Sequence, residues 1–355
     1  MEINSKPSVI NLELMLQPIS EENPAGENLR YTGLYDEIQE ARRADENLNQ
    51  GEWQTELKVA DYRKVIGLAT PALEQDTKDL QIAAWFSEAL TKVHGFVGLR
   101  DSLKLMSGLQ EKFWETIYPE IDEGDMEGRA NAVAWMDTQA AFAIKSAVIT
   151  GYSGYSYIDW EDSKRFDIPD NIDTLDSTDQ QKYKELKAQA EKENRVTAAR
   201  WKVEISQSRR AYYEELIFLI DECWAEYNEL NRIIEEKFDR NQTPGTNNLK
   251  KALDDIQTQV KKILEEKRLE EPDETVTEAE NEELSENADG TVVKVAGVAI
   301  ASGAIQNRQD ALKRLSDIAA FFQKTEPHSP ISYLVQRAVK WGNMPLEVWL
   351  QDVIK

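Results

Sequence analysis

Apolar residues recur at every third or fourth position along most of this chain of 355 residues. An α-helix turns once every 3.6 residues, so this spacing gathers the apolar side chains on one face of a helix. The pattern is clearest in two long stretches, which contain Tyr212, Leu216, Leu219, Cys223, Tyr227, Leu230 and Ile234, and then Leu249, Leu253, Ile256, Val260 and Ile263. We therefore predict an all-α protein.

The two long stretches predict a middle helical hairpin or bundle over residues 179–269. The breaker TPGTNN separates them, and two helices joined by a Pro-Gly turn are typical of an antiparallel hairpin. The second stretch has the spacing of a coiled-coil seam, so pairing within one chain and pairing between chains both stay open. It lacks the roughly three to four heptads that would compel an intermolecular coil, which favours pairing within one chain.

Residues 1–150 predict an N-terminal helical domain. Helical spacing recurs over residues 78–93, and we expect Asp76 or Thr77 to cap the start of that helix. Gly95 follows the helix and suits a left-handed position after its end. Residues 151–178 show no sustained period and are interpreted as an aromatic-rich connection that packs locally.

The composition changes sharply after the middle segment. Residues 270–289 hold ten acids and no Lys or Arg; the acids are Glu270, Glu271, Asp273, Glu274, Glu278, Glu280, Glu282, Glu283, Glu286 and Asp289. Their charges repel one another and the stretch buries little apolar surface, so residues 270–304 predict an acidic, disordered, flexible linker. Helical spacing returns in three short segments over residues 305–355. Such a small module has a weak core, and we expect it to be stabilised by association with its own copies or with a partner.

The overall charge excludes several kinds of partner. The chain has 42 Lys and Arg against 66 Asp and Glu, a formal net charge of −24. This surface repels phosphate backbones and anionic lipid headgroups, so we expect no nucleic acid and no polybasic membrane anchor. The opening MEINSKPSVI is not typical of a secretory signal, and no apolar run reaches the ~20 residues of a spanning helix. With Cys223 as its one cysteine, the chain predicts a cytoplasmic protein without direct membrane insertion.

The sequence offers little for catalysis. Its two histidines are His94 and His328, and the motifs CxxC, HExxH, GxSxG, GxGxxG and GxxxxGK[ST] are absent. We predict no catalytic residue, no cofactor and no metal site, and hence a protein that is not an enzyme. A carboxylate-dependent hydrolase within the helical domain stays as an alternative, which a deep pocket holding carboxylates of strongly perturbed pKa would favour.

Charged residues in the N-terminal domain admit two interpretations. They form either a functional polar surface or the interhelical ion pairs and caps that fix helix packing, and we favour the second. The set comprises Arg30, Arg42, Arg43, Asp45, Lys58, Asp61, Arg63, Lys78 and Asp79. The aromatic residues Trp53, Trp85, Trp114 and Trp135 are expected to anchor the core.

Short signatures follow one another through the N-terminal region. They include LxPIS, NPAGENLRY, GEWQTELKVADYRKV, TKDLQIAAWF, GFVGL and FWETIYPEID. In order and spacing they resemble the N-terminal region of the TssA family, also called ImpA-like, of bacterial type VI secretion. The matching residues are Pro24, Gly26, Leu29, Arg30, Tyr31, Arg42, Arg43, Gly51, Trp53, Lys58, Asp61, Lys78, Asp79, Leu80, Trp85, Gly95, Phe96, Gly98 and Leu99. A second resemblance lies near the other end, around EPHSPISYLVQRAVKW.

The resemblance implies a non-enzymatic structural component of the type VI secretion apparatus. It implies an oligomeric scaffold that assists assembly of baseplate, tube and contractile sheath, forms a homo-oligomeric ring, and reaches the membrane-docked apparatus through these partners. The short segment after the acidic linker resembles a short-form, baseplate-associated member. A generic cytoplasmic helical adaptor of another multi-protein complex is the alternative. For self-association or partner docking we expect Leu312, Leu315, Phe322, Glu326, Pro327, Ser329, Pro330, Leu334, Arg337, Trp341 and Trp349.

Overall fold

The structure, a computed structural model, divides into two units, residues 1–282 and residues 283–355. It describes residues 3–45, 58–272, 314–315, 318–319, 321–323 and 330–342. Within these ranges the regular elements are helices, and β-structure is limited to isolated bridges. The predicted all-α fold is confirmed. The predicted acidic linker lies, beyond residue 272, outside the described residues.

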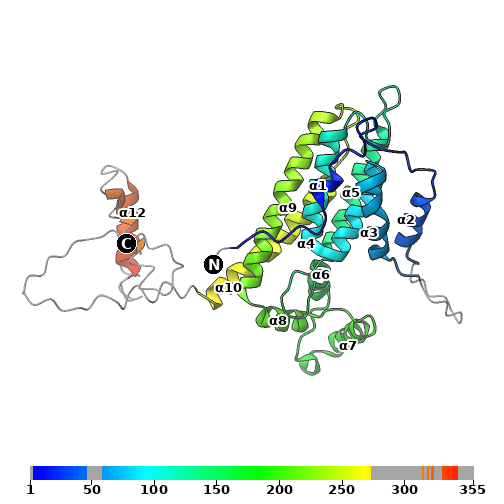
Figure 1. Ribbon diagram of the computed structural model, residues 1–355. Coiled ribbons are helices and arrows are strands. Elements are labelled where there is room, and N and C mark those ends of the chain that lie inside the picture. Colours follow the sequence, from blue (N-terminus) through cyan, green and yellow to red (C-terminus); the bar gives the residue numbers. More distant parts are fainter. Residues whose placement is uncertain are drawn as a thin grey trace, which may run out of the picture. The chain divides into compact units, whose positions relative to one another are not determined.

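Four long helices form the centre of the first unit (Figure 1). They are α4 (Leu80–Phe113), α5 (Glu127–Lys145), α9 (Arg210–Lys237) and α10 (Asn247–Glu270). Helices α5 and α9 each pack against both α4 and α10, so the four helices enclose one core. Helices α9 and α10 thus pair within the chain, as the sequence favoured.

The apolar stripes of α9 and α10 supply much of this core. Leu253, Ile256 and Val260 are completely buried, and they belong to one core cluster that also includes Met15 and residues of α4 and α5. Buried residues from both sides of the limits predicted at residues 150 and 178 belong to this cluster. Periodicity shows that a helix has an apolar face, but it does not say which other helix covers that face.

Three shorter helices precede the central four. They are α1 (Leu12–Met15), α2 (Leu34–Arg42) and α3 (Tyr62–Pro71). Helix α3 packs against α4, and α2 packs on α3. A π-helical turn over Ala72–Asp76 continues α3 and leads into the start of α4.

Helix α4 is capped by Asp79, so the prediction of a cap at Asp76 or Thr77 was wrong. The Asp79 carboxylate accepts hydrogen bonds from the backbone N–H groups of Gln81 (2.7 Å) and Ile82 (3.1 Å). Several short polar residues precede the helix, and apolar spacing does not choose among them. The expectation for Gly95 is confirmed: its φ is +59°, and it kinks α4.

The predicted connection over residues 151–178 contains helix α6 (Tyr157–Arg165) and a 3₁₀ turn, Ile172–Thr174. Ser156 and Asp159 form a capping box at the start of α6, with each side chain bonded to the backbone N–H of the other residue. No sustained period was expected in this segment, and α6 was not predicted. Helix α6 is short and mostly polar, so its sequence shows no apolar stripe.

Two more helices follow α6 and lie near it at one end of the bundle (Figure 1). They are α7 (Ser177–Lys192) and α8 (Ala198–Gln207), and α6 packs against α8. In the second unit, α12 spans Pro330–Gly342, and residues 314–315, 318–319 and 321–323 are also helical. Helix α12 begins at Pro330, where proline has the preferred φ and needs no N–H partner.

Candidate functional site

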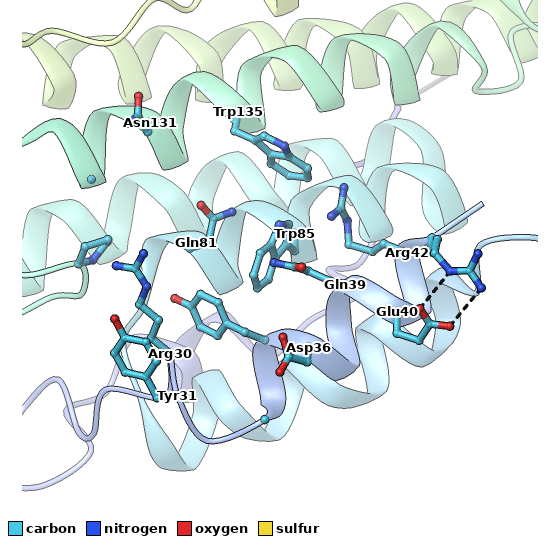
Figure 2. Close-up of a pocket in the computed structure, with 15 residues that line it drawn as sticks. Arg30, Tyr31, Asp36, Gln39, Glu40, Arg42, Gln81, Trp85, Asn131 and Trp135 are labelled. Carbon is cyan, nitrogen blue, oxygen red and sulfur yellow. Dashed lines mark hydrogen bonds and ion pairs between the residues drawn. The ribbon is translucent and has the colours of Figure 1, made fainter. Parts of the chain in front are cut away.

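A pocket of about 1120 Å³ opens between α2, the first turns of α4, and α5 (Figure 2). We call it the N-terminal pocket. Its lining residues are Arg30, Tyr31, Gly33, Tyr35, Asp36, Gln39, Glu40, Arg42, Arg43, Gln81, Trp85, Pro119, Gly128, Asn131 and Trp135. Five of them, Arg30, Tyr31, Arg42, Arg43 and Trp85, belong to the signature set, so the structure brings together residues that the sequence singled out separately.

Tyr35 and Trp85 form a fixed aromatic wall of this pocket. Their rings meet edge to face, with centroids 4.8 Å apart and planes at 78°. The Tyr35 hydroxyl donates a 2.7 Å hydrogen bond to the carboxylate of Asp79. Burial, and then the charge of Asp79, raise the pKa of Tyr35 well above its usual value, so the hydroxyl stays a donor. Burial also raises the pKa of Asp79.

Arg42 joins the pocket to the helices behind it. Its guanidinium lies 4.4 Å from the centroid of the Trp135 ring and 5.9 Å from that of Trp85. Its Nε donates a 2.6 Å hydrogen bond to Glu88, whose carboxylate also accepts one from the Tyr62 hydroxyl (3.3 Å). The charge of Arg42 is therefore balanced, and the side chain ties α2 to α4 and α5.

A second group of charges lies at the end of α2. Arg43 forms ion pairs with Glu40 (3.0 Å) and Asp45 (2.6 Å), and the Lys58 ammonium also pairs with Glu40. The hydrogen bonds from Lys58 and then Arg43 lower the pKa of Glu40 to about 2. These contacts hold Lys58 beside the end of α2, which supports the structural interpretation of Arg43, Asp45 and Lys58. Gly51 and Trp53 lie in the segment 46–57, outside the described residues.

Arg30 differs from the other cations of the pocket. Its guanidinium lies 5.7 Å from the centroid of the Tyr31 ring, and it makes no hydrogen bond or ion pair with another residue in the described part of the chain. The Tyr31 side chain is 88% exposed. Figure 2 shows Arg30 and Arg42 toward opposite ends of the pocket, with Trp85 between them.

Lys78, also a signature residue, has a structural position. Its side chain is completely buried, and its ammonium donates hydrogen bonds to the carbonyls of Met15 (2.9 Å) and Leu73 (2.6 Å). These carbonyls belong to α1 and to the π-helical turn, and the Lys78 ammonium is the hydrogen-bond donor that satisfies them. Burial lowers the pKa of Lys78 to about 8. Asp61 is structural as well, since its carboxylate accepts from the backbone N–H of Lys64 (2.9 Å) and caps α3.

Two signature glycines are required by close backbone contacts. A Cβ on Gly26, whose φ is +69°, would lie 2.1 Å from the Asp76 carbonyl oxygen. A Cβ on Gly98 would lie 2.1 Å from the Leu90 carbonyl oxygen, just beyond the kink in α4. The buried apolar members of the set are Leu80, Trp85, Phe96 and Leu99, while Pro24 and Leu29 are half-buried.

Arg129 was not singled out from the sequence. It is buried in α5, and its guanidinium donates to the carbonyls of Ile117 (2.7 Å), Pro119 (2.7 Å) and Trp114. Burial lowers its pKa to about 10, so it remains a cation at neutral pH. An arginine is usually a surface residue. Only the fold shows that this one contacts the carbonyls that follow α4.

The predicted self-association residues fall in the second unit. Leu334 is 66% exposed on α12 and Arg337 is also exposed, whereas Leu315 and Phe322 are half-buried. Pro330 and Trp341 belong to the same helix. The other members, Leu312, Glu326, Pro327, Ser329 and Trp349, lie outside the described residues.

The described part of the chain shows no group of three or more His, Cys, Asp and Glu residues suited to hold a metal ion. Cys223 is completely buried, its thiol donates to the Phe96 carbonyl (3.2 Å), and burial raises its pKa. Glu40 lines the N-terminal pocket, and its lowered pKa makes it a poor general acid. No helix within the described ranges has both the length and the apolar composition needed to cross a membrane.

Known proteins similar to this chain share its N-terminal region. Residues 16–138 match the family described as ImpA, N-terminal, type VI secretion system. Type VI secretion system component TssA1 of Pseudomonas aeruginosa is 23% identical over 117 residues. That alignment covers 33% of this chain and 34% of the relative, so the chain matches about a third of the relative's length.

A solved structure extends the likeness of fold over more of the chain. It is the N-terminal domain, including the conserved ImpA_N region, of the TssA component of the type VI secretion system from Burkholderia cenocepacia. The two structures superpose with a TM-score of 0.61 at 24% identity, over 74% of this chain and 96% of the other. Residues 16–138 therefore match the ImpA, N-terminal family of type VI secretion, which confirms the resemblance to TssA proteins that the signatures indicated.

Proposed function

We propose that this chain is a non-enzymatic component of the type VI secretion apparatus, an oligomeric scaffold that assists assembly of baseplate, tube and contractile sheath from the cytoplasmic side. The observation that carries the proposal is the family match over residues 16–138, on a fold shared with the N-terminal domain of a TssA component. We further propose association with the baseplate.

The structure supports a binding role in two ways. Most charged signature residues serve as helix caps, carbonyl donors or ion pairs, so they stabilise the fold. The N-terminal pocket, in contrast, leaves aromatic and polar groups on its surface. In the second unit, α12 carries the exposed Leu334. Ile318 and Phe321 of the same unit are exposed as well, and several exposed apolar side chains on so small a helical unit favour association.

Removal of the gene from a host that assembles a type VI apparatus tests this proposal. We expect secretion of the tube protein into the medium to fall to the level of a strain without the apparatus, and the complete chain supplied in trans to restore it. Unchanged secretion after removal would contradict the proposal.

Self-association has a matched pair of variants. Leu334→Asp places a charge at a position that is 66% exposed on α12, and Phe142→Asp places one at a position that is 65% exposed on α5. We expect Leu334→Asp to lower the particle mass of the full-length protein in light scattering, and Phe142→Asp to leave that mass unchanged. Equal masses for wild type and Leu334→Asp would contradict the assignment to α12.

A further inference from the structure

We propose that the N-terminal pocket binds an extended segment of a partner polypeptide, in which one Asp or Glu side chain pairs with Arg30 and a neighbouring aromatic or large aliphatic side chain packs on the half-buried Trp135. The inference rests on the proposed function, because a scaffold without chemistry of its own acts by binding other polypeptides. It names the class of ligand that this surface recognises.

The size of the pocket favours a polypeptide over a small metabolite. Its volume of about 1120 Å³ exceeds the roughly 300–1,000 Å³ typical of small-molecule sites. Its labelled side chains extend from Arg30 past Trp85 to Arg42, so that a ligand contacting both ends has the form of a chain (Figure 2).

The charges select a carboxylate at the Arg30 end. Glu88 balances Arg42, and Glu40 and Asp45 balance Arg43, whereas the Arg30 guanidinium forms no ion pair with a described residue and acts on the charge of Asp79 only through space. A guanidinium donates two parallel hydrogen bonds to a carboxylate. The net charge of −24 and the acidic Asp36 and Glu40 in the lining oppose a polyanion, which favours a single carboxylate over a nucleic acid or an acidic tract.

Three side-chain amides suit the backbone of an extended segment. Gln39, Gln81 and Asn131 line the pocket, and no hydrogen bond of their side chains to another described residue is seen. Each amide offers donors and an acceptor, the groups that match the C=O and N–H of a polypeptide. Because they come from α2, α4 and α5, a bound segment would contact all three helices.

The aromatic side chains of the pocket are already held in place. Tyr35 is fixed by its hydrogen bond to Asp79 and its edge contact with Trp85, and Arg42 is stacked on Trp135. A surface that is ordered before binding loses less conformational entropy when the ligand arrives. Trp, Tyr and Arg are also the residues that dominate binding energy at interfaces.

Selection of random linear peptides, displayed on phage, on the full-length protein tests the inference. Arg30→Gln protein serves to subtract peptides that bind elsewhere. We expect an enriched consensus with one Asp or Glu beside an aromatic or large aliphatic residue. A synthetic peptide of that consensus should lose about tenfold or more in affinity for the Arg30→Gln protein, and a similar amount when its own acid is replaced by Ala.

The matched control is Arg63→Gln, which removes the same charge from an exposed arginine of α3 outside the pocket. We expect it to bind the peptide as the wild type does, and the losses from Arg30→Gln and from the peptide's acid to be non-additive. Three results would each overturn the inference: no consensus, equal affinity for wild type and Arg30→Gln, or a consensus without an acid. A consensus that matches a segment of this chain would overturn the assignment to a partner.

The purified binding assay needs no other part of the apparatus, so the two proposals fail separately. Failure of peptide selection, with secretion still dependent on the gene, removes only the pocket assignment. A pocket that binds the selected peptides in a protein whose removal leaves secretion intact removes the proposed function and leaves the ligand class standing.

Discussion

Buried cations hold together the ends of helices in the first unit. Lys78 and Arg129 each donate to backbone carbonyls and form no ion pair with another described residue. Carbonyls at helix ends have no partner within their own helix and require a donor when they are buried. The two side chains therefore stabilise the path of the chain around α4.

Arg129→Ala tests this role directly. The carbonyls of Trp114, Ile117 and Pro119 lose their donor in a buried environment, and we expect the free energy of unfolding to fall by about 2–4 kcal/mol. Urea unfolding measures the change. Arg63→Ala, at an exposed position, should stay within about 0.5 kcal/mol of the wild type. Equal stability of the two variants would contradict the role.

Lys78 predicts a dependence of stability on pH. Its pKa is about 8 in the folded protein, against roughly 10.4 for an unperturbed lysine. Between these values the unfolded state binds more protons, so the contribution of Lys78 to the free energy of unfolding rises with pH. Lys78→Met does not titrate. We expect the stability of the wild type relative to this variant to rise by about 1–2 kcal/mol from pH 7.5 to 9.5; a constant difference would contradict it.

The sequence indicated which of these charged residues matter, but it did not indicate what each of them does. The ordered signatures singled out Lys78 and Asp79, but a charged residue in a motif can belong to a surface or to a buried cap. The structure separates the two cases through burial and backbone partners. Arg129 had no signal in the sequence, because its partners follow α4 and meet α5 only in the fold.

At the scale of elements, a side chain of one helix caps the start of another helix across the bundle. The Asp137 carboxylate on α5 accepts hydrogen bonds from the backbone N–H groups of Asn248 (3.1 Å) and Leu249 (2.9 Å), at the start of α10. No side chain at Thr246, the residue before α10, performs this function. The orientation of α10 is thus fixed by a residue far away in the sequence.

We expect Asp137→Ala to lower the free energy of unfolding by about 1–2 kcal/mol, because two N–H groups lose their acceptor. Asp137→Asn keeps an acceptor oxygen and should lose less. Asp254→Ala, at an exposed site on α10, is the control for replacing an acid. Thermal unfolding followed by circular dichroism measures all three, and an Asp137→Ala protein as stable as the control would contradict capping by Asp137.

Helices with long apolar stripes could be predicted from the sequence, and helices without them could not. Helices α9 and α10 bury one continuous face, which spacing alone reveals. Helix α6 is nine residues long and largely polar, and its capping box lay unnoticed among the Ser and Asp residues of the supposed connection. Short helices of this kind depend on caps and tertiary contacts more than on periodicity.

At the scale of the molecule, the first unit is one compact body with a shared core. Because α9 and α10 cover α4 and α5, residues 1–150 alone would expose the faces that these helices bury. We expect a fragment of residues 1–150 to lack a cooperative unfolding transition, and a fragment of residues 1–272 to unfold in one transition. Urea titration followed by tryptophan fluorescence compares them. Cooperative unfolding of the shorter fragment would contradict a shared core.

The long helices of this body were predicted from the sequence, whereas their common core is seen only in the structure. A change of composition marked the end of α10 at residue 270, since acidic residues replace the apolar stripe there. No change of composition separates α5 from α9 in the same way, and the intervening aromatic residues suggested a link between domains. Which helices share a core is a property of three-dimensional packing, which local spacing does not encode.

The most direct test of a role at the type VI apparatus is affinity purification of the tagged, full-length chain after chemical crosslinking in cells that assemble the apparatus. Quantitative mass spectrometry then compares the recovered proteins with those from an untagged strain. We predict enrichment of baseplate, tube and sheath proteins, with crosslinks to the chain itself. Recovery of an unrelated complex, or of none of these proteins, would contradict the account.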